Sequence, residues 1–93
     1  MKPTNFNQLK NYLQVGMKLK LVNTSMKDHK YLNMERPIIK KQTNAIKFEG
    51  GSWFGLGSTG EKASDFTFQE NGFTFTWDKG TGFEGFLQYE YIN

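Results

Sequence analysis

The chain has 93 residues, a formal net charge of +3 and no cysteine, which excludes disulfide bridges, thiolate zinc sites and cysteine nucleophiles. This length is typical of one domain with one core, so we expect residues 1–93 to form a single domain, whose core the nine Phe, four Tyr and two Trp can supply. No segment reaches the roughly 18 apolar residues of a membrane span, and residues 1–13 lack the apolar stretch of a secretory signal, so we expect a cytoplasmic protein without membrane contact.

The first predicted element is a short helix over residues 4–15. Asn5 is a candidate N-cap, and Gln8 follows three residues later, as in a capping box. Apolar side chains then recur on one face at helical spacing, at Phe6, Leu9 and Leu13. We expect this face to pack against a β-sheet formed by residues 17–92.

From Met17 onward the apolar spacing changes to alternation, which predicts a half-buried strand with a basic outer face. Residues 23–35 have no clear period and predict a long loop, held to the core by Tyr31, Leu32 and Met34. Residues 36–48 predict either one bent strand or two short strands joined at Thr43–Asn44. A short strand over 52–56 then follows a double-glycine turn.

The clearest local signal is a hairpin over residues 65–77. Asn71–Gly72 is the favoured pair for a type I′ turn, and it lies between two alternating runs of Phe and Thr. Counting outward from this turn pairs Phe68 with Phe75 and Phe66 with Trp77, and places every aromatic side chain of the hairpin on one face. The closing stretch predicts a last strand that ends at residue 92, with one face formed by Leu87, Tyr89 and Tyr91.

Together these segments predict a mainly β (α+β) fold, with a short N-terminal helix and five to seven antiparallel strands. Three architectures fit this pattern: a small SH3-like barrel, an OB-like barrel and an open curled sheet. The strands are short and separated by turn residues, which all three architectures require.

We find no catalytic or metal-binding pattern in the chain. Gly55–Gly60 match G-x-G-x-x-G, but the next strand begins five residues later and leaves no room for a crossover helix. We therefore interpret this segment as a flexible glycine-rich loop. His29 is the only histidine, and no triad or metal-ligand spacing accompanies it. The sequence predicts a protein that is not an enzyme and holds no metal or cofactor.

The charge is unevenly distributed along the chain. Residues 1–50 carry ten basic and three acidic side chains, a balance of +7, whereas residues 51–93 carry two and six, a balance of −4. Cationic surfaces with aromatic platforms bind single-stranded nucleic acid, because phosphate contacts release counterions while bases stack. The candidate binding residues are the basic side chains near the strands and two adjacent aromatics: Lys18, Lys20, Arg36, Lys40, Lys41, Lys47, Trp53 and Phe54. In the competing interpretation the aromatics belong to the core, and the lysines only protect edge strands from aggregation.

The segments RPIIKKQTNAIKF, GSW and KASDF resemble small uncharacterised proteins of bacteriophages and other bacterial mobile elements. This resemblance covers roughly residues 16–77, and the WFGLGSTGE stretch departs from it. It implies an accessory protein that acts by stoichiometric binding, either to nucleic acid or to a host protein such as a defence nuclease. It brings no catalytic residue with it.

Three binding hypotheses follow. The first is nucleic-acid binding through the basic and aromatic residues, and the second is inhibition of a host defence protein by direct protein–protein contact. The third is carbohydrate or small-ligand binding on Trp53, Phe54 and Trp77. Solvent exposure of Trp53 and Phe54 separates them, because the first and third hypotheses need an exposed aromatic platform.

Overall fold

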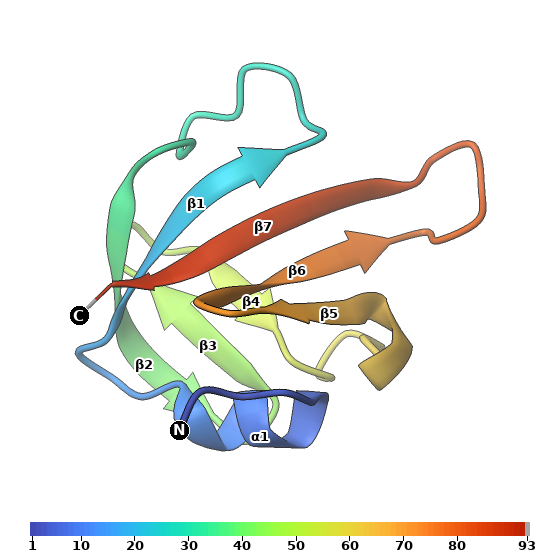
Figure 1. Ribbon diagram of the computed structural model, residues 1–93. Helices are drawn as coiled ribbons and strands as arrows, with labels where there is room; N and C mark the ends of the chain where they lie inside the picture. The colour runs from blue at the N-terminus through green and yellow to red at the C-terminus, as the bar shows by residue number, and fades with distance from the viewer. Residues whose placement is uncertain (93) are drawn as a thin grey trace.

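The computed structural model describes residues 1–92, so Asn93, the last residue of the predicted domain, lies outside the described residues. These residues form one helix, α1 (Phe6–Tyr12), a 3₁₀ turn at Ala63–Asp65 and one antiparallel sheet. The strands are β1 (Lys18–Thr24), β2 (Glu35–Gln42), β3 (Ala45–Phe48), β4 (Trp53–Gly55), β5 (Phe66–Gln69), β6 (Gly72–Trp77) and β7 (Gly85–Ile92). Their spatial order is β4-β3-β2-β1-β7-β6-β5 (Figure 1). The predicted mainly β fold is confirmed.

The sheet curls without closing into a barrel, so the open curled sheet is the predicted architecture that is observed and the two barrels are not. β4 and β5 are its edges. Phe54 of β4 packs across the opening on Phe66 and Phe75, with ring centroids 6.4 and 5.6 Å apart. α1 covers one end of the curled sheet, and the loop between β1 and β2 lies at the opposite end (Figure 1).

The helix has the predicted N-cap, Asn5, but at Phe6–Tyr12 it is shorter at both ends than the predicted residues 4–15. Asn5 caps it by accepting a hydrogen bond from the Gln8 backbone N–H at 2.8 Å. The helix stops at Tyr12 and not at residue 15, because Leu13 is already extended and carries the chain to a turn at Gly16, whose φ is +97°. The predicted inner face is confirmed in its main part, since two of its residues are fully buried: Leu9 and Leu13.

Residues 35–48 form two strands joined at Thr43–Asn44, one of the two predicted alternatives. A bulge between Ile38 and Lys40 bends β2. Its first half pairs with β1 and its second half with β3. This bend is where the sheet turns back over its own inner face.

The β5–β6 hairpin forms with a register that differs by two residues from the prediction. Phe66 pairs with Phe75 and Phe68 with Phe73, whereas the sequence predicted Trp77 and Phe75 as their partners. Neither Asn71 nor Gly72 has the positive φ of a type I′ turn, so that turn assignment was wrong.

Gly72 lies in a strand and not in the predicted turn. It is the first residue of β6, and a Cβ at this position would lie 1.9 Å from the carbonyl oxygen of Tyr89 on β7. The close approach of β7 therefore requires glycine here and sets the hairpin register. Because a shift of two residues keeps every side chain on its face, the predicted aromatic face survives, with Phe66 and Phe73 buried in the core.

The loop between β1 and β2 is held mainly by backbone hydrogen bonds. Tyr31 packs against the core as predicted, but Leu32 and Met34 are 39% and 48% exposed, so their predicted anchoring role was wrong. The backbone N–H of Asn33 instead donates to the carbonyl of Leu21 at 2.7 Å. This bond fixes the end of the loop against β1.

The glycine-rich segment 55–62 is organised around one carboxylate, and its flexibility stays a prediction. Glu61 accepts hydrogen bonds from the backbone N–H groups of Gly57 and Thr59, at 3.0 and 3.1 Å, and from the Thr59 hydroxyl. Burial alone would raise the pKa of Glu61, but these hydrogen bonds outweigh it and lower the pKa. Leu56 is fully buried and ties the segment to the core.

Candidate functional site

The eight predicted binding residues do not form one continuous surface. Phe54 is only 8% exposed and belongs to the core, so its predicted role as an exposed platform was wrong for both nucleic acid and sugars. Lys41 points to the end of α1, where its ammonium donates to the Leu13 carbonyl. Burial there lowers the pKa of Lys41. Its predicted phosphate contact is therefore replaced by a structural contact that caps the helix.

Lys18 and Lys20 lie on β1, and acidic neighbours offset part of the charge of Lys20. Lys20 is paired across the strands with Glu35 of β2 on one side and Glu90 of β7 on the other. Lys18, two residues earlier on β1, lies between Pro37 of β2 and Ile92 of β7. An anion that approaches this part of the sheet meets carboxylates as well as ammonium groups.

A second basic surface lies on β2, β3 and β4, where Lys40, Lys47 and Trp53 are direct cross-strand neighbours. We call these three residues the Trp53 row. Side chains alternate between the two faces of a strand, and the neighbours of Lys47, Ile46 and Phe48, are buried, so the row faces outward. Trp53 is 46% exposed, and the Lys47 ammonium lies 5.7 Å from its ring centroid.

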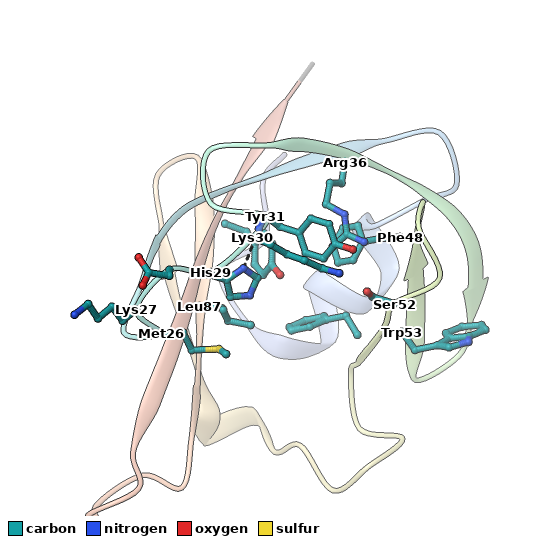
Figure 2. Close-up of a pocket in the computed structure, with 13 residues that line it drawn as sticks. Met26, Lys27, His29, Lys30, Tyr31, Arg36, Phe48, Ser52, Trp53 and Leu87 are labelled. Carbon is teal, nitrogen blue, oxygen red and sulfur yellow. Dashed lines mark hydrogen bonds between the residues drawn. The ribbon is translucent and has the colours of Figure 1, made fainter.

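A pocket of about 490 Å³ lies between residues 26–31 and the inner face of the sheet (Figure 2). Phe48, Phe54 and Tyr89 supply an aromatic wall, and Tyr31 and His29 cover it from the loop. Trp53 lies at the rim with its indole pointing outward (Figure 2). The volume and the largely apolar lining are typical of small-molecule sites.

Three of the predicted site residues line this pocket, Arg36, Trp53 and Phe54, and Arg36 is the only cation among them. It is 8% exposed, and its guanidinium lies 3.6 Å from the Tyr31 ring centroid and 4.7 Å from that of Phe48. One of its N–H groups donates to the Glu49 carbonyl at 2.8 Å. Two aromatic faces and one backbone carbonyl therefore fix the orientation of the cation.

The loop side of the pocket has a defined donor pattern. The Tyr31 backbone N–H donates to Nδ1 of His29 at 3.1 Å, so the neutral imidazole carries its proton on Nε2. A hydrogen bond with Lys30 lowers the pKa of the Tyr31 phenol; burial opposes this, while the charges of Lys30 and Arg36 add to it. The Lys30 ammonium lies 4.9 Å from the Tyr31 ring centroid.

The sequence analysis named Arg36 but missed the pocket around it. His29 and Tyr31 were assigned to an irregular loop, and no local pattern places that loop over the sheet. A usable signal was present in β2, because Arg36 and the buried Ile38 are two residues apart and therefore face the same side of the strand.

No family model, curated protein sequence or solved structure matches this chain. The resemblance to bacteriophage and mobile-element proteins therefore stays a prediction. Within the described residues, no helix has the length and hydropathy needed to cross a membrane. The same residues include no group of three or more His, Cys, Asp or Glu placed to hold a metal ion.

Proposed function

We propose that this protein is a non-catalytic binding module for single-stranded nucleic acid, and that the Trp53 row is its contact surface. The observation that carries this proposal is the exposure of Trp53 on an edge strand, next to Lys47 and Lys40. An indole that is nearly half exposed can stack on a base of any sequence, and each stacked base contributes about 1–3 kcal/mol. The two ammonium groups contact phosphates on the same face.

The row is favoured over the β1 lysines for an electrostatic reason. Lys40 pairs with Lys47, and Lys47 pairs with Trp53 on its other side, whereas Lys20 lies between two glutamates. Neighbouring strands are about 4.8 Å apart, so the three residues span about 10 Å of surface. The positive charge and the stacking platform are therefore within reach of adjacent nucleotides.

The test is a fluorescence anisotropy titration of a labelled oligothymidylate with the wild type and three variants. Trp53→Ala should weaken binding about tenfold, because it removes the stacking platform. Lys47→Gln should reduce the salt slope of the binding constant by about 0.7, the value for one phosphate contact on a single strand. Lys20→Gln is the matched control, because it removes the same charge from β1. It should change affinity less than twofold, since Glu35 and Glu90 already offset the charge of Lys20.

Binding that is absent at low salt, or insensitive to salt, would contradict the proposal. An equal loss in Lys20→Gln and Lys47→Gln would also contradict it, since net charge alone would then explain the attraction. Trp53→Phe keeps an aromatic face at the same position and should retain most of the affinity.

A second candidate function, inhibition of a host protein by direct contact, is favoured by Phe83. This side chain is 83% exposed on the β6–β7 hairpin, which projects from the body of the molecule (Figure 1). The tip is well organised, because Thr81 binds the Asp78 carbonyl at 2.7 Å and Glu84 accepts from the Gly80 N–H at 2.9 Å. A large apolar side chain held in this way suits insertion into a partner's pocket.

The test of this second function is an affinity pull-down from bacterial lysate with wild type and Phe83→Ser. One host protein should be recovered in stoichiometric amount with the wild type and lost with the variant. Recovery of nucleic acid alone, with both forms, would exclude it in favour of the first function.

A further inference from the structure

The pocket beneath residues 26–31 contains a buried cation without an acidic partner in the described part of the chain. Arginine that is buried to this degree is normally paired with a carboxylate, because an uncompensated charge is costly away from water. Arg36 forms no ion pair within residues 1–92, and its one side-chain hydrogen bond there is to a backbone carbonyl. Within residues 1–92, then, no carboxylate pairs with this guanidinium.

The free donors of Arg36 are open to the pocket. A guanidinium has five N–H groups, and only one of these is used by Glu49. Within residues 1–92, the Tyr91 hydroxyl is the only buried side-chain polar atom that is both shielded from solvent and without a hydrogen-bond partner. No nitrogen of Arg36 is in that condition. The remaining nitrogens of Arg36 therefore keep some solvent exposure, and because Arg36 lines the pocket, a ligand there can accept from them.

The rest of the lining adds positive charge and apolar aromatic surface. Lys27 and Lys30 join Arg36, against the single carboxylate of Asp28, so the lining carries three cations and one anion. Nε2 of His29 and the hydroxyl of Ser52 are further polar groups on it. The opposite wall is aromatic, with Phe54 and Tyr89 ring centroids 5.7 Å apart.

We propose that this pocket binds a nucleoside phosphate, with the phosphate on the Arg36 and Lys30 side and the base against the aromatic wall. A planar guanidinium matches the geometry of phosphate oxygens, and the compact ammonium adds a second positive charge. The aromatic wall favours a ligand with a planar ring over a simple anion, because aromatic side chains pack on such a ring. The glycine motif at Gly55–Gly60 takes no part in this site, since none of its residues lines the pocket.

Of the Trp53 row only Trp53 touches this pocket, at its rim, and neither Lys40 nor Lys47 lines it, so either claim can fail without the other. The nucleoside phosphate can come from two sources, a free nucleotide or the phosphorylated end of a strand. Both present the same chemistry to Arg36, and the experiment below separates them.

The experiment is isothermal titration calorimetry of the full chain with AMP, GMP, CMP and UMP. At least one of them should bind saturably, and the matching nucleoside and inorganic phosphate alone should each bind at least tenfold more weakly. Lys30→Gln lies on the exposed rim, leaves the core intact, and should weaken binding at least fivefold. Arg36→Lys keeps the charge but removes the planar guanidinium with its parallel N–H donors, and it should weaken binding more than Lys30→Gln does.

Control variants locate the site, and competition with oligonucleotides identifies the source of the nucleoside phosphate. Lys18→Gln on β1 and Lys40→Gln on the Trp53 row, neither of which lines the pocket, should leave nucleotide affinity unchanged. A 5′-phosphorylated oligothymidylate that competes with the mononucleotide, when the unphosphorylated one does not, identifies a strand end as the source. Competition by neither oligonucleotide identifies a free nucleotide.

No saturable binding of any of the four nucleotides at millimolar concentration would overturn this inference. Unchanged affinity in Lys30→Gln would overturn it as well, even if Arg36→Lys failed to fold. Binding of inorganic phosphate as tight as that of the nucleotide would also overturn it, because the aromatic wall would then have no role.

Discussion

Tyr91 carries a buried hydroxyl that has no hydrogen-bond partner within residues 1–92. The ring is 2% exposed and contacts Phe73 and Tyr12, with centroids 6.1 and 5.0 Å away. Burying a hydroxyl without a partner is unfavourable, whereas the ring itself stabilises the core. Tyr91→Phe should therefore raise the free energy of unfolding by about 1 kcal/mol, as measured by urea denaturation. A decrease of that size would show that the hydroxyl has a partner in solution.

Tyr89 makes stability depend on pH in the alkaline range. Burial raises its pKa to about 12, and the nearby charge of Arg36 opposes this rise only in part. In the unfolded chain the phenol ionises at about pH 10, so the stabilising effect of neutral Tyr89 is complete below that pH. It is lost between about pH 10 and pH 12, at about 1.4 kcal/mol per pH unit.

Urea unfolding of the wild type and Tyr89→Phe at pH 9 and pH 11.5 isolates this residue from the lysines that titrate in the same range. The wild type should lose more stability than the variant across this interval, by about 1–2 kcal/mol. Parallel losses in the two proteins would contradict the raised pKa of Tyr89.

At the scale of the elements, the contact between β6 and β7 depends on Gly72. Any Cβ at this position meets the Tyr89 carbonyl at 1.9 Å, and a backbone atom cannot move aside without moving the strand. Gly72→Ala should therefore destabilise the protein by about 3 kcal/mol, as measured by chemical denaturation. Gly82→Ala is the matched control, because nothing lies within 4 Å of its added Cβ. A loss in Gly72→Ala no larger than in the control would contradict the observed β6–β7 pairing.

The same contact explains how far the elements could be predicted from the sequence. Period-two alternation is local, so it correctly placed Leu19, Leu21 and the hairpin aromatics on inner faces. Register is not local here. The Asn71–Gly72 pair favoured a type I′ turn, but β7 approaches Gly72 closely, and the turn lies one residue earlier, at Glu70–Asn71, which shifts the pairing by two residues.

For the molecule as a whole, the sequence predicted which residues are basic and aromatic but not which of them meet. Alternation within the Trp53–Phe54 pair implies opposite faces, and the structure leaves Trp53 outside and Phe54 in the core. Lys41 is drawn inward by the end of α1, a contact between segments 28 residues apart. The pocket needs the β1–β2 loop to fold over the sheet, and backbone hydrogen bonds without a sequence signature hold it there.

The central claim is that single-stranded nucleic acid binds on the Trp53 row, and backbone amide NMR tests it most directly. Oligothymidylate should be added to ¹⁵N-labelled protein at low salt, with the two indole N–H signals assigned by Trp77→Phe. We expect shift changes at the Trp53 indole and at the amides of β3 and β4, and their reversal by added salt. Changes confined to β1 or to residues 78–84, or no change at all, would contradict it.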